Sequence, residues 1–106
     1  MKVKIPFKPR FREAMLSTPQ RKTWTSRTRK YGHKGDTFDA FGCTFEIVEE
    51  PEKKTLEFVG YHYKEEGCSC WKDFYDVWVE IHPRRGFDRH QQVYPHVFKR
   101  LGVTAS

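Results

Sequence analysis

Apolar residues recur along the chain at two spacings, and each spacing predicts one kind of element. Alternation of apolar and polar residues predicts strands over 2–6, 23–28, 37–41, 43–48 and 92–101. Apolar residues three or four positions apart predict helices over 10–16, 56–66 and 69–82. Short strands around two or three helices indicate an α+β fold.

Single residues mark the ends of the predicted helices: Thr55 and Ser69 as N-caps, Gly67 and Pro83 as stops. Pro95 interrupts the last predicted strand, which indicates an edge strand or a bulge because proline cannot donate to a ladder. Residues 102–106 are expected to form a frayed tail. The domain is therefore expected to span 1–101.

The same pattern nominates a core. The strands contribute Phe38, Phe45 and Ile47, and the helix over 69–82 carries a stripe that we expect to be buried against the sheet: Trp71, Phe74, Val77, Trp78 and Ile81. Trp24 is expected to be buried as well. With 37% hydrophobic residues in 106, the chain is long enough for one core and not for two.

Composition narrows the setting of the protein. The sequence has neither an apolar run of membrane-spanning length nor a secretory signal, which indicates a cytoplasmic protein. The three cysteines, Cys43, Cys68 and Cys70, are expected to be reduced. The spacing Cys68-Ser69-Cys70 is not that of a zinc knuckle, so we expect neither a metal nor another cofactor.

Charge is distributed unevenly along the chain. The formal net charge is +6, and no carboxylate lies between Glu13 and Asp36. This interval holds six bases: Arg21, Lys22, Arg27, Arg29, Lys30 and Lys34. Acids gather instead between Glu46 and Glu66, so an electrically polarised molecule with an anion-facing segment is predicted, although solvated surface charge is the plain alternative.

One motif in the basic segment resembles a known family. The run Lys22-x-x-Thr25-x-Arg27, followed by Gly35-Asp36, is similar to the signature of the ASCH domain, a member of the PUA-like superfamily. The likeness continues through Glu65-Glu66-Gly67 and Ile81-His82-Pro83 and covers nearly the whole chain. One difference is the turn over 17–20, where the family usually has a glycine before the basic pair.

The resemblance implies a fold and an activity. The fold would be a small PUA-like β-barrel with covering helices. Some ASCH proteins are amidohydrolases that act on N4-acetylcytidine, with a lysine, a threonine and a glutamate at positions matching Lys22, Thr25 and Glu66. Thr25 would attack the acyl carbon and Lys22 would accept its proton, which requires a lowered lysine pKa. Neighbouring Arg21, Arg27 and Lys30 would lower that pKa, and Glu66 would oppose them.

Two other interpretations remain open from the residues. Lys22, Thr25 and Glu66 can be ordinary solvated or structural residues. Alternatively, the protein is an RNA-binding module without catalysis, in which Arg21, Arg27, Arg29 and Lys30 contact phosphates, with Trp24 and Tyr31 interleaved as stacking surfaces. The expected partner is thus a nucleoside substrate or RNA.

Overall fold

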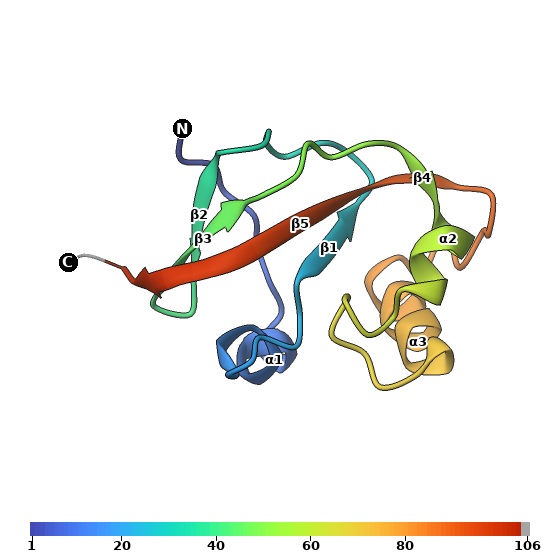
Figure 1. Cartoon of the computed structure of the whole chain (residues 1–106). Coiled ribbons are helices and arrows are strands. Elements are labelled where there is room, and N and C mark those ends of the chain that lie inside the picture. Colours follow the sequence, from blue (N-terminus) through green and yellow to red (C-terminus); the bar gives the residue numbers. More distant parts are fainter. Residues whose placement is uncertain (105–106) are drawn as a thin grey trace.

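The computed structural model describes residues 1–104, which form five strands and three α-helices (Figure 1). The strands are β1 (Trp24–Arg27), β2 (Thr37–Ala40), β3 (Cys43–Ile47), β4 (Lys54–Thr55) and β5 (Gln92–Val103). The helices are α1 (Arg12–Leu16), preceded by a 3₁₀ turn over Pro9–Phe11, α2 (Leu56–Tyr61) and α3 (Trp71–Ile81). The predicted α+β class is confirmed.

The long strand β5 organises the sheet. It pairs antiparallel with β1 and β3 in the strand order β1-β5-β3-β2, and its start pairs antiparallel with β4. Among residues 1–104, β1 and β2 are the outer strands of this order and do not pair with each other. The sheet is therefore antiparallel as described, and closure into a barrel is not seen.

The prediction that Pro95 marks an edge strand or a bulge is wrong, because β5 lies between β1 and β3 and its ladder with β1 passes Pro95 without a register shift. Pro95 lies opposite Ser26 of β1. On its other side β4 stops pairing at Val93, and β3 begins to pair at Phe98. The N–H that proline lacks would fall in this gap between two ladders, so no ladder hydrogen bond is lost.

The hairpin of β2 and β3 supplies the centre of the core as predicted. Phe38, Phe45 and Ile47 are all buried, and the rings of Phe38 and Phe45 stack with centroids 5.4 Å apart. The connecting residues Phe41 and Gly42 both have positive φ, 53° and 77°, as a two-residue type I′ turn requires. This twist brings both rings against β5.

The first helix forms where the spacing predicts it, and it buries Phe11, Ala14 and Met15. The second helix is shorter than predicted. Thr55 caps it as expected, accepting a bond from Phe58 N, but α2 ends at Tyr61 and does not reach Glu66. Residues 62–67 form turns instead. The carbonyl of Glu65 accepts from the main-chain amides of Thr23 and Trp24 rather than from a helical partner.

The third helix buries only part of its predicted stripe. Phe74, Val77 and Trp78 are buried, but Trp71 and Ile81 are 38% and 43% exposed because they lie in the first and last turns. The N-cap is Cys70 rather than Ser69, and its sulfur accepts from Asp73 N. His82 follows the helix and its ring stacks on Trp78.

The two ends of the chain also differ from the prediction. Residues 2–6 form a single bridge, Lys2 with Thr37, rather than a strand, since Pro6 lacks the N–H that a continuing ladder would use. At the other end β5 continues to Val103, two residues beyond the predicted end, by pairing with the start of β3. Of the predicted tail, residues 105–106 lie outside the described part of the chain.

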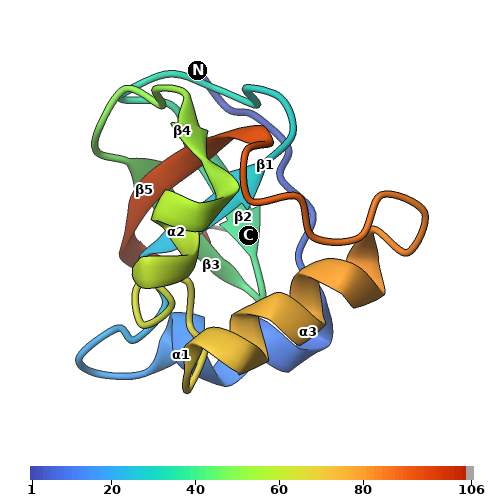
Figure 2. The same cartoon turned by 90° about the vertical axis from the view of Figure 1, so that its right-hand side faces the viewer.

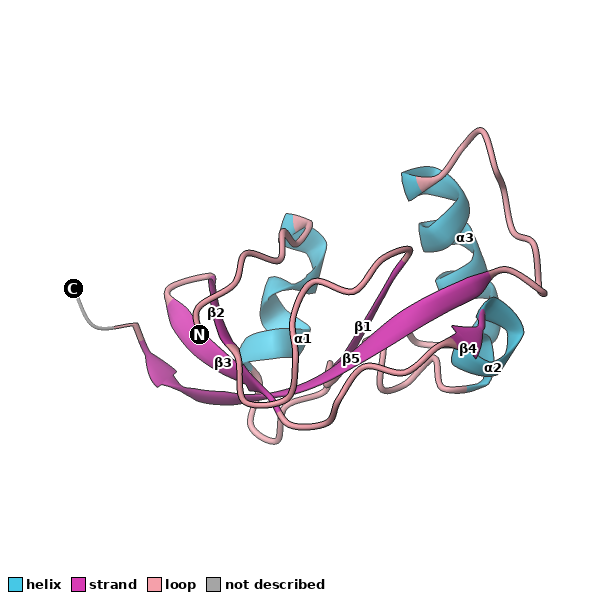
Figure 3. Ribbon diagram, turned by 90° about the horizontal axis from the view of Figure 1, so that it is seen from above, coloured by secondary structure: helices cyan, strands magenta, loops and turns pink. Residues whose placement is uncertain are grey.

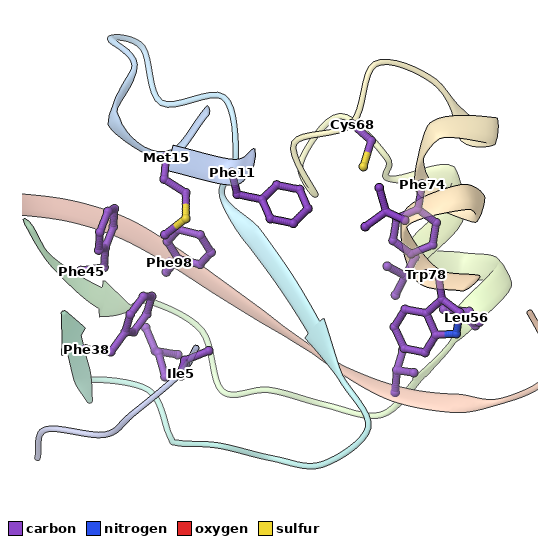
Figure 4. Close-up of a cluster of buried hydrophobic side chains, with 14 residues drawn as sticks. Ile5, Phe11, Met15, Phe38, Phe45, Leu56, Cys68, Phe74, Trp78 and Phe98 are labelled. Carbon is purple, nitrogen blue, oxygen red and sulfur yellow. The ribbon is translucent and has the colours of Figure 1, made fainter. Parts of the chain in front are cut away.

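Helices α1 and α3 lie on the same side of β5, with β1 between them (Figures 1 and 3). Figure 2 shows α3 crossing the molecule in front of α1. The core follows this arrangement. Phe11, which lies just before α1, points toward Phe74 and Cys68 on the α3 side (Figure 4). In the described chain no helix combines the length and the apolar character needed to cross a bilayer.

Candidate functional site

A cavity of about 470 Å³ lies where β1, the segment before α1 and α3 meet. Its apolar lining includes Phe7, Phe11, Phe74, Val77, Trp78 and Ile81. Its polar lining includes Lys22, Thr25, Ser26, Arg27 and Glu66. The three residues predicted to be catalytic are thus brought to one cavity, although Glu66 is 41 positions after Thr25 in the sequence.

Lys22 is the most unusual side chain of the cavity. It is 2% exposed, and its Nζ donates to the carbonyls of Glu66 and Trp24 at 2.6 and 2.8 Å. The carboxylate Oε1 of Glu66 lies 3.7 Å away, and the amine sits 4.4 Å from the centre of the Phe11 ring. Its donors are directed at protein groups, and water has little access to them.

The path into this position needs no glycine before the basic pair. The main-chain amides of Arg21 and Lys22 both donate to the carbonyl of Ala14, at 2.9 Å each. Gln20 holds the same turn, since its amide donates to the carbonyl of Lys22 and its oxygen accepts from Arg100 N. Lys22 therefore enters from the turn before β1. In a regular strand, residues 22 and 25 would lie on opposite faces, so both reach the cavity only because Lys22 precedes the strand.

Glycine is required instead at the far side of the lysine. Gly67 has a φ of +87°, and a Cβ at this position would lie 2.9 Å from Cβ of Lys22. The turn after α2 can therefore pack directly on the lysine stem only because residue 67 lacks a side chain.

Glu66 is held by two partners. Ser26 Oγ donates to Oε2 at 2.6 Å, and Oε1 faces Lys22 Nζ. The carboxylate is 5% exposed. The turn that carries it is fixed to β1, because the carbonyl of Glu65 accepts from the amides of Thr23 and Trp24, both at 2.8 Å.

Thr25 and Arg27 form the second polar pair. Arg27 Nε donates to Thr25 Oγ1 at 2.9 Å, and its Nη2 donates to the carbonyl of Pro6. The guanidinium also lies over the rings of Phe7 and Tyr31, at 5.0 and 5.7 Å. Arg27 thus projects a fixed cation toward a buried hydroxyl that lines the cavity.

Burial lowers the pKa of Lys22, and the nearby carboxylate of Glu66 opposes this effect. The catalytic interpretation requires this direction of the pKa, which the opposed effects of the three bases and Glu66 left open in the sequence, and the attribution to three bases is only partly right. Arg27 contributes to lowering the pKa, whereas desolvation is the main cause. Arg21 instead lies 3.4 Å from Glu13 at the surface, and Lys30 contacts Glu50.

The remaining bases of the segment are not gathered on one anion-facing surface. Glu50 accepts from His33 and Lys34 N as well as contacting Lys30, which lowers the pKa of this carboxyl to about 2. Arg29 lies over the Tyr31 ring at 4.4 Å. The predicted separation of acidic and basic halves is therefore wrong here, because the fold places residues 30–34 beside Glu50.

Trp24, expected in the core or as a stacking surface, is half-buried. Its ring stacks on that of His62, with centroids 4.7 Å apart, and on that of Phe58 at 6.5 Å. It lies outside the cavity lined by Thr25 and Ser26.

Two further residues of the site region were not predicted. Alternation along a strand would place Ser26 on the face opposite Thr25, yet both line the cavity, because β1 is an outer strand and the cavity follows its open edge. His96 is fully buried on β5, where Nδ1 donates to the carbonyl of Tyr94 and Nε2 accepts from Tyr31 N. It fixes the loop that carries the Tyr31 ring beside Arg27. A histidine within the mostly apolar run 93–98 was the available signal.

The cysteines supply no additional site. All three are thiols, with Cys68 buried and Cys70 exposed. Burial raises the pKa of the Cys68 thiol to about 11. Within residues 1–104 no group of three or more His, Cys, Asp or Glu side chains is placed to hold a metal ion.

The chain was compared with protein-family models, with curated proteins and with solved structures. None of the three comparisons found a match.

Proposed function

We propose that the protein is an amidohydrolase of the ASCH type, with a PUA-like fold, that removes the acyl group from N4-acetylcytidine or a related acylated pyrimidine nucleoside. The observation that carries the proposal is the buried Lys22, whose pKa is lowered in a cavity that it shares with Thr25 and Glu66. The resemblance of the motif to ASCH sequences supplies the substrate class.

The energetics of Lys22 favour a functional role. Removing an ammonium from water costs several kcal/mol, and an apolar side chain of similar volume often gives equal or greater stability. A lysine kept in such a place, with a lowered pKa and beside a cavity, is characteristic of functional sites. The lowered pKa increases the fraction of neutral amine, which is the form that can accept a proton.

The reaction would proceed in two halves. In the first, Thr25 Oγ attacks the acyl carbon while its proton passes to Lys22 Nζ; the C–N bond then breaks, and the leaving cytosine amine takes a proton from the ammonium. In the second, water attacks the acyl-threonine ester, Lys22 accepts the water proton, and the carboxylic acid leaves as Thr25 regains its hydrogen. Arg27 stabilises charge at the Thr25 oxygen, and Glu66 holds the substrate amine.

The RNA-binding alternative has weaker support from the geometry. Of its four predicted contact residues, Arg21 and Lys30 are paired with carboxylates and Arg27 lines the cavity. Arg29 is left over the Tyr31 ring. If these bases nevertheless contact phosphates, the affinity for single-stranded RNA should fall with salt at a log-log slope near −3.

The direct test is turnover of N4-acetylcytidine, followed as release of cytidine. The parent protein should release cytidine, and Lys22→Met should not, because methionine fills the same space without an ionisable nitrogen. Lys72→Met is the matched control, since Lys72 is an exposed lysine that pairs with Asp76 and does not line the cavity.

Two results would contradict the proposal. One is the absence of turnover above buffer with acetylated cytidine and its acyl homologues. The other is equal turnover in the parent and Lys22→Met proteins when circular dichroism shows both to be folded.

A further inference from the structure

We infer that Ser26 is a positioning residue of this site, whose hydroxyl orients the Glu66 carboxylate. The inference rests on the proposed function for its kinetic consequence, but the contact itself is independent of any substrate. Ser26 occupies an unspecified position of the motif on which that function was proposed, Lys22-x-x-Thr25-x-Arg27.

The contact is short and enclosed. Ser26 Oγ donates to Glu66 Oε2 at 2.6 Å, and the two residues are 8% and 5% exposed. A hydroxyl that donates to a carboxylate forms one of the stronger hydrogen bonds in proteins. The other carboxylate oxygen faces Lys22 Nζ at 3.7 Å. With one partner on each oxygen, the plane of the carboxylate is fixed.

Ser26 is well placed to impose this orientation, because its backbone belongs to a paired strand. The main-chain bond from Phe98 N to Thr23 O sets the alternation of the ladder between β1 and β5. By that alternation, the polar backbone groups of Trp24 and Ser26 face the open edge of β1. The carbonyl of Trp24 accepts from Lys22 there. The lysine, the serine and the carboxylate thus meet along one rigid edge.

The two adjacent hydroxyls have separate partners, which indicates separate roles. Thr25 Oγ1 accepts from Arg27 Nε, so its oxygen faces a cation and its hydrogen remains available for transfer. The Ser26 hydrogen is already given to Glu66. Thr25 is therefore suited to attack, and Ser26 to hold the group that receives the substrate amine.

The test compares Ser26→Ala with Ser26→Thr. Alanine removes the donor, whereas threonine keeps a hydroxyl donor on the same carbon. Thr44→Val is the matched control, since Thr44 Oγ1 donates to Asp39 at 2.9 Å in an exposed hydroxyl–carboxylate pair away from the site. The readouts are kcat and KM for N4-acetylcytidine and the ¹³C chemical shift of the Glu66 carboxyl carbon, measured by NMR at one fixed pH.

We expect Ser26→Ala to lower kcat by about tenfold to a hundredfold with little change in KM, which corresponds to one hydrogen bond to a charged group. The ¹³C chemical shift of the Glu66 carboxyl carbon should change, because one of its oxygens loses its hydrogen-bond donor. Ser26→Thr should recover most of both properties, and Thr44→Val should change neither.

Three results would overturn the inference: parent-like kinetics in Ser26→Ala, an unchanged ¹³C shift of the Glu66 carboxyl carbon, or complete loss of turnover in Ser26→Ala while Thr25→Val stays active. The last would make Ser26 the attacking hydroxyl and Glu66 its base. If the parent shows no turnover, the proposed function fails, and the ¹³C shift alone then decides whether Ser26 holds the Glu66 carboxylate.

Discussion

Replacing Gly67 by alanine tests how the lysine is held. Gly67 has a φ of +87°, and an added Cβ would lie 2.9 Å from Cβ and 3.1 Å from Cγ of Lys22. Real Cβ atoms do not approach other carbons so closely, so either the turn or the lysine stem must move. Gly67→Ala therefore combines a backbone cost with a steric cost at the site.

The two costs can be separated by magnitude and by a matched variant. A non-glycine residue in the left-handed region costs about 1–2 kcal/mol. Forcing an extra methyl into a packed interior typically adds about 1–3 kcal/mol. Gly35 has nearly the same φ, +93°, and a Cβ added there meets nothing within 4 Å. Gly35→Ala should therefore show the backbone cost alone.

The assay is urea denaturation of the parent, Gly35→Ala and Gly67→Ala, with turnover of N4-acetylcytidine measured on the same samples. We expect Gly67→Ala to be less stable than Gly35→Ala by about 1–3 kcal/mol. It should also lose turnover, since a displaced lysine stem moves Nζ from its two carbonyl acceptors. Gly35→Ala should retain parent-like turnover.

Equal denaturation midpoints for the two alanine variants would refute this reasoning, because the contact between residue 67 and the lysine would then carry no cost. Parent-like turnover in Gly67→Ala, with the stability loss present, would show that the lysine stem moves without moving its amine.

Three further outcomes follow from the buried groups. Trp78→Ala should cost about 3–5 kcal/mol in urea denaturation, and Trp78→Phe roughly half as much or less, because within residues 1–104 the buried indole N–H has no hydrogen-bond partner to lose. Since burial lowers the pKa of Lys22 below its ordinary 10.5, the unfolded chain binds more protons between the folded-state pKa and that value. Stability should rise with pH across this window, and Lys22→Met should remove that contribution; an unchanged slope would contradict it. Iodoacetamide should modify the exposed Cys70 well before Cys68, whose thiol is buried with a pKa of about 11; mass spectrometry showing the reverse order would refute this.

Local patterns predicted much of the fold because local forces decide those parts. The hairpin core of Phe38 and Phe45, the cap at Thr55 and the first helix all follow from periodicity and turn chemistry. The errors arose where distant segments compete for the same backbone. Residues 62–67 left the helical pattern because the Glu65 carbonyl bonds to amides beside β1, and that contact is invisible to periodicity.

The candidate site divides in the same way. The resemblance of the motif implied that Lys22, Thr25 and Glu66 would come together, and all three line the same cavity. It did not predict Ser26, because strand alternation assumes that a site lies on one face of the sheet. At an outer strand the open edge admits side chains from both faces. The role of β1 as an outer strand depends on long-range pairing with β5, which alternation cannot supply.

The charge pattern shows why a basic segment need not be a binding surface. Arg21 pairs with Glu13, which precedes the basic segment, and Lys30 pairs with Glu50, which follows it. Lys22 is withdrawn from solvent altogether. A surface ion pair changes the free energy of unfolding little. Burying the Lys22 ammonium lowers the stability of the fold by several kcal/mol unless its N–H donors are hydrogen-bonded. The burial of this one amine, with its cost in folding free energy, therefore indicates the site more strongly than the net charge of the segment does.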